Sequence, residues 1–187
     1  MIDKKLILAS KSPRRKDLLT QLAYPFSIEL IDVDESYDSS MNPLEVPEFL
    51  AKKKAAGFTK IEKDTVVITA DTIVLCENKI LEKPKNEVEA KKMLETLSDN
   101  MHLVLTGVSL KSSDRQVYFT STSEVYFHKL LAEEIDFYIK NYSPYDKAGG
   151  YGIQEWIGLI AIKKINGSYT NIVGLPMERL YQELKAF

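Results

Sequence analysis

The sequence is poor in the residues on which several common kinds of site depend. Cys76 is the only cysteine among 187 residues, which excludes an internal disulfide framework and a metal cluster made of cysteines alone. The two histidines, His102 and His128, argue against a zinc site with several histidine ligands. The longest apolar runs are far shorter than the roughly 20 residues that span a bilayer, and no signal peptide is visible at the N-terminus. We therefore expect a cytoplasmic protein with no membrane partner.

The chain also lacks an excess of charge of one sign. Twenty-five Lys and Arg residues stand against 27 Asp and Glu residues, which leaves a formal net charge of −2. No overall positive field is present to attract a nucleic acid, so we expect no nucleic-acid partner. Apolar residues at 44% and charged residues at 28% are ordinary for a globular chain. The length suits one domain or two closely packed lobes, and with no internal repeat or linker we expect a single domain over residues 1–187.

Helical and strand patterns alternate along the chain. The strongest strand signal is Thr65 to Leu75, which is rich in Val, Ile and Thr. Gly158 to Ile165 and Tyr169 to Val173 are expected to form a hairpin around Asn166-Gly167. The other expected elements are strands at 6–9, 27–31, 79–81, 102–111 and 116–129, and helices starting at Ser12-Pro13, Leu50, Asn86, Ala132 and Pro176. This interleaving predicts an α/β or α+β fold with a mixed sheet.

The segment Ser10-Lys11-Ser12-Pro13-Arg14-Arg15 is a candidate phosphate site, because it follows a strand and opens a helix. A helix N-terminus presents unpaired N–H groups and a partial positive charge, which favour phosphate. Two hydroxyls and two guanidiniums add further donors. The alternative is an ordinary helix cap followed by a solvated basic turn. Two arginines in a first turn oppose the helix dipole, so they are mildly unfavourable there without an anion.

Asp71 is the second candidate, because it interrupts the most apolar strand of the chain. A carboxylate buried there without a partner costs several kcal/mol. Three situations relieve that cost: a metal, a lysine, or a turn that carries the carboxylate to water. In the last case Asp71 is a strand-end residue with no chemical role.

Three further segments give weaker signals. Most runs such as Lys52-Lys53-Lys54 are solvated helix faces, with at most one side chain pointing inward. Lys83 precedes Pro84, an arrangement typical of a surface turn. The glycines of Asp146-Lys147-Ala148-Gly149-Gly150-Tyr151-Gly152-Ile153-Gln154 allow a ligand to approach the backbone closely, but the segment matches neither a P-loop nor G-x-G-x-x-G.

Taken together, these segments resemble the Maf family of nucleoside triphosphate pyrophosphatases over nearly the whole chain. The S-x-S-P-R-R start and the D-K-A-G-x-Y-G-I-Q segment are the specific motifs. The other matching pieces are Asp34-Glu35, Leu50 to Ala55, Ala70 to Val74, Lys83-Pro84, Leu97-Ser98 with His102, Thr106-Gly107-Val108 and Gly174-Leu175-Pro176. Glu82 and Asp99 depart from the family pattern, which often has glycine at both positions.

The resemblance implies a two-lobed fold like that of inosine triphosphatases, with a mixed twisted sheet, flanking helices and a central cleft, in a homodimer. It also implies hydrolysis of dTTP and UTP to the monophosphate and pyrophosphate, assisted by Mg²⁺, Mn²⁺ or Co²⁺. The catalytic residues it implies are Asp71 as proton acceptor, with Lys54 and Lys83. Glu35 and Asp71 match the metal-binding pair, and the substrate-binding residues are Ser10, Ser12, Arg14, Arg15, Thr72 and Gln154.

The residues are chemically compatible with this role. A triphosphate brings about four negative charges, so its site needs cations even on a net acidic protein. A metal held by carboxylates activates water and neutralises developing charge, and Mg²⁺ needs few protein ligands of this kind. The amide of Gln154 both donates to and accepts from a pyrimidine edge. Two alternatives stay open: a pyrophosphatase that clears modified nucleotides, and a nucleotide-binding regulator of division with little turnover.

Overall fold

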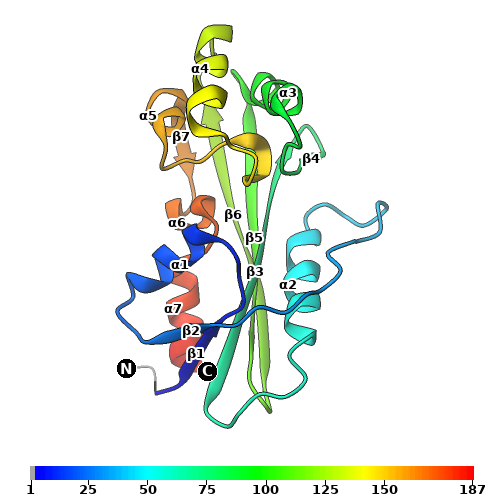
Figure 1. Ribbon diagram of the computed structural model, residues 1–187, viewed down its shortest axis with the longest axis vertical. Helices are drawn as coiled ribbons and strands as arrows, with labels where there is room; N and C mark the ends of the chain where they lie inside the picture. The colour runs from blue at the N-terminus through cyan, green and yellow to red at the C-terminus, as the bar shows by residue number, and fades with distance from the viewer. Residues whose placement is uncertain (1–2) are drawn as a thin grey trace. The chain divides into compact units, whose positions relative to one another are not determined.

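The computed structural model describes residues 3–187 as an α/β fold with a mixed sheet (Figure 1). Its elements are, in chain order, β1 (Lys5–Leu8), α1 (Pro13–Thr20), β2 (Phe26–Ile28), α2 (Val46–Ala56), β3 (Thr65–Cys76), β4 (Lys79–Leu81), α3 (Glu87–Leu97), β5 (Met101–Lys111), β6 (Gln116–Phe127), α4 (Ala132–Tyr142), the short 3₁₀ helix η1 (Ala148–Gly150), α5 (Trp156–Ala161), β7 (Ile162–Asn166), α6 (Tyr169–Val173) and α7 (Met177–Ala186). The strand order in the sheet is β2-β1-β3-β5-β6-β7, with β4 paired to β3. β1 runs parallel to β2 and β3, whereas β3 with β4 and β6 with β7 are antiparallel. The expected mixed α/β class is confirmed.

The chain forms two compact units, and β3, β5 and β6 contribute to both. Unit 1 contains the chain up to Thr72, Thr106–Ser121 and Gly174–Phe187. Unit 2 contains Ile73–Leu105 and Thr122–Val173. No helix among residues 3–187 combines the length and apolar character that a membrane crossing requires.

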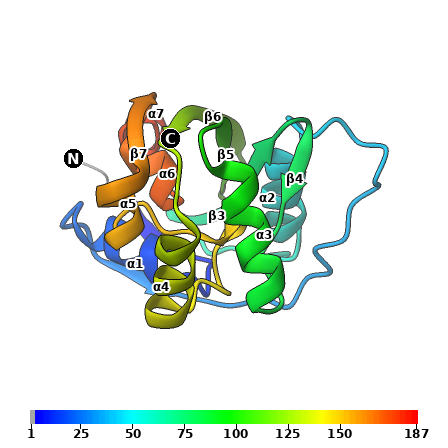
Figure 2. The same ribbon diagram turned by 90° about the horizontal axis from the view of Figure 1, so that it is seen from above.

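Unit 1 is built on the parallel pairing of β1 with β3. Leu8 pairs with Ile68 in register, and both side chains are fully buried. α1 and α7 lie on one face of this part of the sheet and α2 lies on the other (Figures 1 and 2). The hydroxyl of Thr69 donates to the carbonyl of Ala51 at 2.7 Å, which ties β3 to α2.

β5 approaches α2 closely at Gly107. A Cβ atom placed on Gly107 would lie 2.3 Å from the carbonyl carbon and oxygen of Pro47. Only glycine permits this approach of the strand to the start of the helix, because backbone atoms have no room to move aside.

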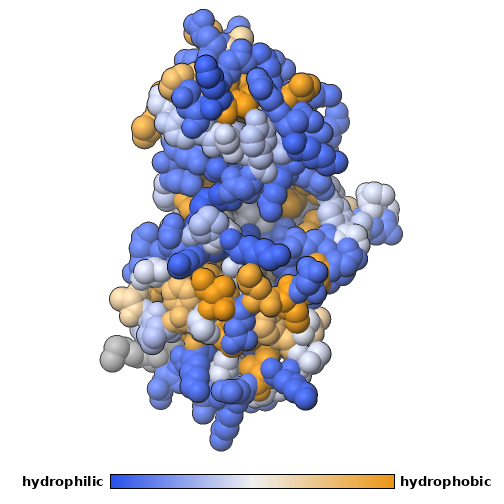
Figure 3. All heavy atoms as spheres, in the orientation of Figure 1, coloured by the Kyte–Doolittle hydropathy of each residue, from blue (hydrophilic) through white to orange (hydrophobic). Residues whose placement is uncertain are grey.

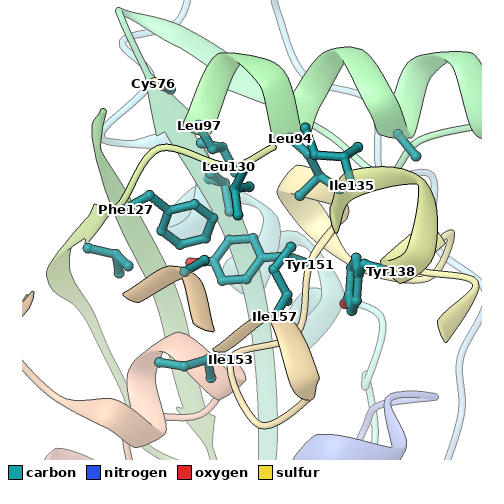
Figure 4. Packing of buried hydrophobic residues seen from close by; sticks show 14 of the residues in the cluster. Cys76, Leu94, Leu97, Phe127, Leu130, Ile135, Tyr138, Tyr151, Ile153 and Ile157 are labelled. Carbon is teal, nitrogen blue, oxygen red and sulfur yellow. The ribbon is translucent and has the colours of Figure 1, made fainter. Parts of the chain in front are cut away.

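Unit 2 contains a core of aromatic and branched side chains contributed by its strands and by α3 to α6 (Figure 4). α3 and α4 pack against each other in this unit (Figure 2). His102, Phe127 and Tyr151 meet edge to face, with ring centroids 5.1–5.4 Å apart. The Tyr151 hydroxyl and His102 Nε2 share a hydrogen bond of 2.7 Å. The buried Tyr151 therefore anchors the glycine-rich segment in the core of unit 2.

Several helix boundaries follow the sequence signals. Ser12 is the N-cap of α1 and Pro13 is its first residue, as expected. Asn86 caps α3 by accepting from the N–H of Glu89 at 2.9 Å, but the Glu89 carboxylate accepts from the N–H of Lys85 instead of completing a capping box. Pro176 directly precedes α7.

The expected hairpin around Asn166-Gly167 is wrong. Its first arm is the helix α5 followed by β7, and its second arm is the helix α6. β7 pairs with β6, with Ile165 opposite Val125, so its partner is a strand from elsewhere in the chain. The Asn171 side chain in α6 donates to the carbonyl of Val104 at 3.0 Å and to the Ser123 hydroxyl at 2.9 Å. These tertiary contacts hold Tyr169–Val173 as the helix α6, where the sequence predicted the second strand of a hairpin.

Candidate catalytic site

The centre of the candidate site in unit 1 is an ion pair between α2 and β3. Lys54 Nζ lies 2.6 Å from Asp71 Oδ1 and 3.0 Å from Glu35 Oε2. The side chains of Lys54 and Asp71 are 15% and 14% exposed, whereas Glu35 is 60% exposed on the loop before α2. A lysine is therefore the partner of the carboxylate that interrupts β3.

Helical geometry selects Lys54 from its run of three lysines. Lys52 pairs with Glu48 at 2.8 Å, one turn earlier in α2, and its ammonium lies over the ring of Tyr118. Lys53 pairs with Asp34 at 3.1 Å. Successive residues on a helix point about 100° apart, so one of the three faces Asp71. The expectation that at most one lysine turns inward agrees with this arrangement.

The two carboxylates next to Lys54 form an oxygen-only donor set. Asp71 and Glu35 reach the same ammonium group, so one small cation in that neighbourhood lies within reach of both. Mg²⁺ prefers oxygen ligands and retains waters, so a pair of carboxylates suits it. In residues 3–187 no group of three His, Cys, Asp or Glu side chains is gathered for a metal. The donor chemistry fits a hydrated divalent cation that retains several waters.

The hydroxyls at the start of α1 are used within the protein. Ser12 Oγ accepts the N–H of Arg15 at 3.4 Å, and Ser10 Oγ accepts the N–H of Ser12 at 3.2 Å. Arg14 is half-buried in the first turn of the helix. The helix start therefore has the cap that the sequence indicated, with a guanidinium beside it.

Arg15 makes contacts that join three segments of unit 1. Its Nε donates to the carbonyl of Gly174 at 2.8 Å, Nη1 to the carbonyl of Ala70 at 2.8 Å, and Nη2 to the hydroxyl of Thr72 at 2.9 Å. Burial lowers the pKa of Arg15, while the charges of Asp71 and Glu35 raise it. The arginine is thus bonded to the two neighbours of Asp71.

Thr72 continues this network on the sheet. Its hydroxyl is 3.0 Å from that of Thr106 in β5. Neither Thr106 nor Gly174 was singled out by the sequence as a site residue. Gly174 contributes only its backbone carbonyl, so no side-chain signal could reveal it.

Lys83 and Gln154 belong to unit 2, and both side chains are exposed. Lys83 lies between β4 and α3, just before the buried Pro84. Gln154 lies between η1 and α5.

The first two residues of the glycine-rich motif, Asp146 and Lys147, form ion pairs in unit 2 that include Glu155, a residue that the sequence did not indicate. The buried Lys147 pairs with Glu155 at 3.1 Å and with Asp146 at 2.7 Å. Glu155 accepts a hydrogen bond from the hydroxyl of Tyr138 in α4, and burial raises the pKa of that tyrosine. These contacts fix the residue that directly follows Gln154.

The fold is shared with solved proteins of low sequence similarity. The Ham1 protein of Staphylococcus aureus matches with a TM-score of 0.54 and 17% identity, over 96% of this chain and 100% of that one. At this identity the likeness concerns the fold, and it places the chain among mixed α/β proteins of this architecture.

The chain belongs to the Maf family. The model of that family, described as "Maf-like protein", matches residues 5–187. A protein of Parabacteroides distasonis named dTTP/UTP pyrophosphatase is 49% identical, over 98% of this chain and 96% of its own length. A protein of Phocaeicola vulgatus with the same name is 46% identical, over 97% of this chain and 95% of its own length. The resemblance seen in the sequence is confirmed.

Proposed function

We propose that this protein hydrolyses dTTP and UTP to the nucleoside monophosphate and pyrophosphate, and that residues 1–187 form a single pyrophosphatase domain. The observation that carries the proposal is the pairing of the shielded Asp71 with Lys54, with Glu35 on the same ammonium group. Relatives of nearly equal length that are named for this activity support it.

Asp71 is the proton acceptor in this proposal. A water oxygen attacks the α-phosphorus, its proton passes to the Asp71 carboxylate, and the bond from the α-phosphorus to the bridging oxygen breaks. Pyrophosphate leaves with that oxygen. Lys54 fixes the carboxylate at 2.6 Å and supplies a positive charge where phosphate charge develops.

Glu35 and Asp71 would hold the divalent cation that we propose as cofactor, namely Mg²⁺, Mn²⁺ or Co²⁺. When bound, such a cation activates water and neutralises the charge on the phosphate oxygens. Each carboxylate would then contact the divalent cation as well as Lys54. The Glu35 side chain is 60% exposed, so it is accessible to a cation that arrives from solvent.

The remaining proposed site residues recognise the substrate. Ser10, Ser12 and Arg14 surround the N-terminus of α1, where backbone N–H groups favour an anion. Lys83 supplies a further cation for the phosphates, and Thr72 and Gln154 set the preference for the base. Arg15 is not included, because each nitrogen of its guanidinium already donates to a protein oxygen.

The proposed setting is a homodimer in the cytoplasm that acts on a small molecule and binds no nucleic acid. Exposed apolar side chains in unit 1, among them Ile28, Leu30 and Ile31, are compatible with a partner surface. In Figure 3, hydrophobic residues are grouped in the lower half of the face shown, surrounded by hydrophilic residues. Sedimentation velocity measures the oligomeric state, and a monomer at micromolar concentration would contradict the dimer.

A panel of triphosphates tests the proposed reaction. The purified chain is incubated with dTTP, UTP, CTP, ATP, GTP and modified pyrimidine triphosphates in the presence of Mg²⁺, Mn²⁺ or Co²⁺, and the products are separated by ion exchange. We expect monophosphate plus pyrophosphate, with the highest kcat/KM for dTTP and UTP. A higher kcat/KM for modified nucleotides favours the clearing role. Binding of UTP without product favours the regulator.

A further inference from the structure

We propose that Arg15 is a positioning residue, which clamps the residues on both sides of Asp71 and thereby fixes the direction of the Asp71 carboxylate. This inference rests on the proposed function, since Asp71 is the proton acceptor there. It gives Arg15 a task different from phosphate binding, which the basic helix start suggests at first sight.

The alternation of side chains along β3 sets the geometry of the clamp. Neighbouring residues of a strand point to opposite faces, so Asp71 and Thr72 project to different sides of the sheet. Asp71 meets Lys54 of α2 on one face, while Thr72 meets Arg15 of α1 on the other. The two helices lie on opposite faces of this part of the sheet (Figures 1 and 2). Arg15 therefore acts on Asp71 through the backbone of β3.

The contacts of Arg15 restrain that backbone at two points. The carbonyl of Ala70 accepts at 2.8 Å and the hydroxyl of Thr72 at 2.9 Å, one residue before and one after Asp71. The carbonyl of Gly174 holds the third side of the guanidinium at 2.8 Å. A planar fork with donors on three sides satisfies these acceptors together, which the single ammonium of a lysine cannot do.

The same contacts argue against Arg15 as a principal phosphate ligand. All three nitrogens of its guanidinium are engaged by the protein, and Nη1 also reaches the Ser10 hydroxyl at 3.4 Å. A phosphate would have to compete with the two backbone carbonyls and the Thr72 hydroxyl that already accept from Arg15. The energetic role of the guanidinium is thus to satisfy buried acceptors and to hold the strand.

The Arg15→Lys variant separates positioning from binding, because lysine keeps the charge and loses the fork. We expect kcat for UTP to fall by at least about 30-fold, as for a base displaced by a fraction of an ångström. The Kd of α,β-methylene-UTP, measured by calorimetry, should change by less than about 3-fold. Nearly unchanged kcat together with a Kd weakened by about 10-fold or more would overturn the proposal.

Arg14→Lys is the matched comparison, because it places the same substitution one residue earlier in the same helix turn. We propose Arg14 as a substrate-binding residue at the start of α1, so its variant should lose more in Kd and less in kcat than the Arg15 variant. Equal effects of the two substitutions on kcat and on Kd would contradict a clamp specific to Arg15.

Thr72→Val removes the hydroxyl that accepts from Arg15 Nη2. It tests the clamp without changing Arg15, so it can be measured even if Arg15→Lys does not fold. It should lower kcat for UTP because it removes one acceptor of Arg15. Since Thr72 is also proposed to set the base preference, the readout specific to the clamp is the coupling of the two substitutions in kcat. In a double-mutant cycle the two losses in kcat should be strongly non-additive, since both remove the same contact. Additive losses would overturn the proposal. Absence of UMP from the wild-type protein would instead reject the proposed function, which separates the two failures.

Discussion

The pairing of Lys54 with Asp71 explains how a carboxylate is kept in the middle of a buried strand. An isolated carboxylate in such surroundings costs several kcal/mol, and an ammonium group at 2.6 Å offsets that cost. The same contact keeps a base available next to solvent, since Glu35 extends the charge network toward water. Asp71, whose burial lowers the stability of the fold, is thus the residue placed to accept a proton.

Glu35 and its neighbour Asp34 give a matched test of the metal site. Asp34 faces Lys53 and Ser36, and hydrogen bonds from Ser36 lower the pKa of Asp34 to about 2. We expect Glu35→Gln to raise the Mg²⁺ concentration for half-maximal activity by about 10-fold or more, because it removes one of two anionic oxygen donors. Asp34→Asn should leave that concentration within about 3-fold. Metal titrations of UTP turnover measure both, and equal shifts would remove Glu35 from the metal site.

Among the elements, β5 and α2 make a close backbone contact in unit 1. At Gly107 the start of α2 approaches the strand so closely that backbone atoms of Pro47 and Glu48 occupy the place of a Cβ. This contact holds the N-terminal end of the helix that carries Lys54 against the sheet that carries Asp71. The geometry of the ion pair therefore depends on a residue with no functional group.

Gly107→Ala tests this dependence. Because the clash is with backbone, we expect the free energy of unfolding to fall by about 1–3 kcal/mol, as for an overpacked core. Gly57→Ala is the control: its added Cβ meets flexible side chains of Ile31 and Val33, and its φ of −61° suits alanine. The control should change stability by less than about 1 kcal/mol. Equal losses in urea titrations of the two variants would contradict this account of the packing.

The elements that the sequence predicts correctly carry their signals locally. Ser12-Pro13 caps its helix, and the β-branched run from Thr65 forms a strand. The hairpin expected at Asn166-Gly167 fails because contacts with β6 and Ser123 decide that region. At the site, the sequence predicted that a metal, a lysine or water would compensate the charge of Asp71. Which lysine does so depends on how α2 packs on the sheet. The sequence marks Gly174 only as part of the segment Gly174-Leu175-Pro176, and the contact of its carbonyl with Arg15 depends on the fold.

On the scale of the whole molecule, the net charge of −2 is a sum over both units and does not report where the cations lie. Arg14, Arg15 and Lys54 lie in unit 1, and Lys83 is exposed in unit 2. Solvent screens exposed charges more than about 10 Å apart, so the net charge of a chain says little about the charge that a bound anion meets. A polyanionic substrate is therefore compatible with a weakly acidic protein.

The stability of the whole molecule should fall in acid through His102. Burial lowers the pKa of His102 to about 3, whereas an unfolded histidine titrates near 6.5. Between these values the unfolded chain binds a proton that the folded chain does not, so stability is lost as the pH falls from about 6.5 toward 3. From pH 7 to pH 5 this histidine should cost about 2 kcal/mol.

The comparison of two variants isolates that contribution. His102→Gln removes the titrating group, so its stability should depend less on pH than that of the wild type, by about 2 kcal/mol between pH 7 and pH 5. The exposed His128 supplies the control, and His128→Gln should keep the wild-type dependence. Urea titrations at the two pH values give the result, and identical pH dependence in all three proteins would refute it.

Asp71→Asn tests the central claim most directly. The amide keeps the size of the side chain and can still accept a hydrogen bond from Lys54, but it cannot take a proton from water. We expect UMP and pyrophosphate formation from UTP to fall by at least about 1,000-fold, with a thermal unfolding midpoint within a few degrees of the wild type. Wild-type release of pyrophosphate by the folded variant would contradict the account.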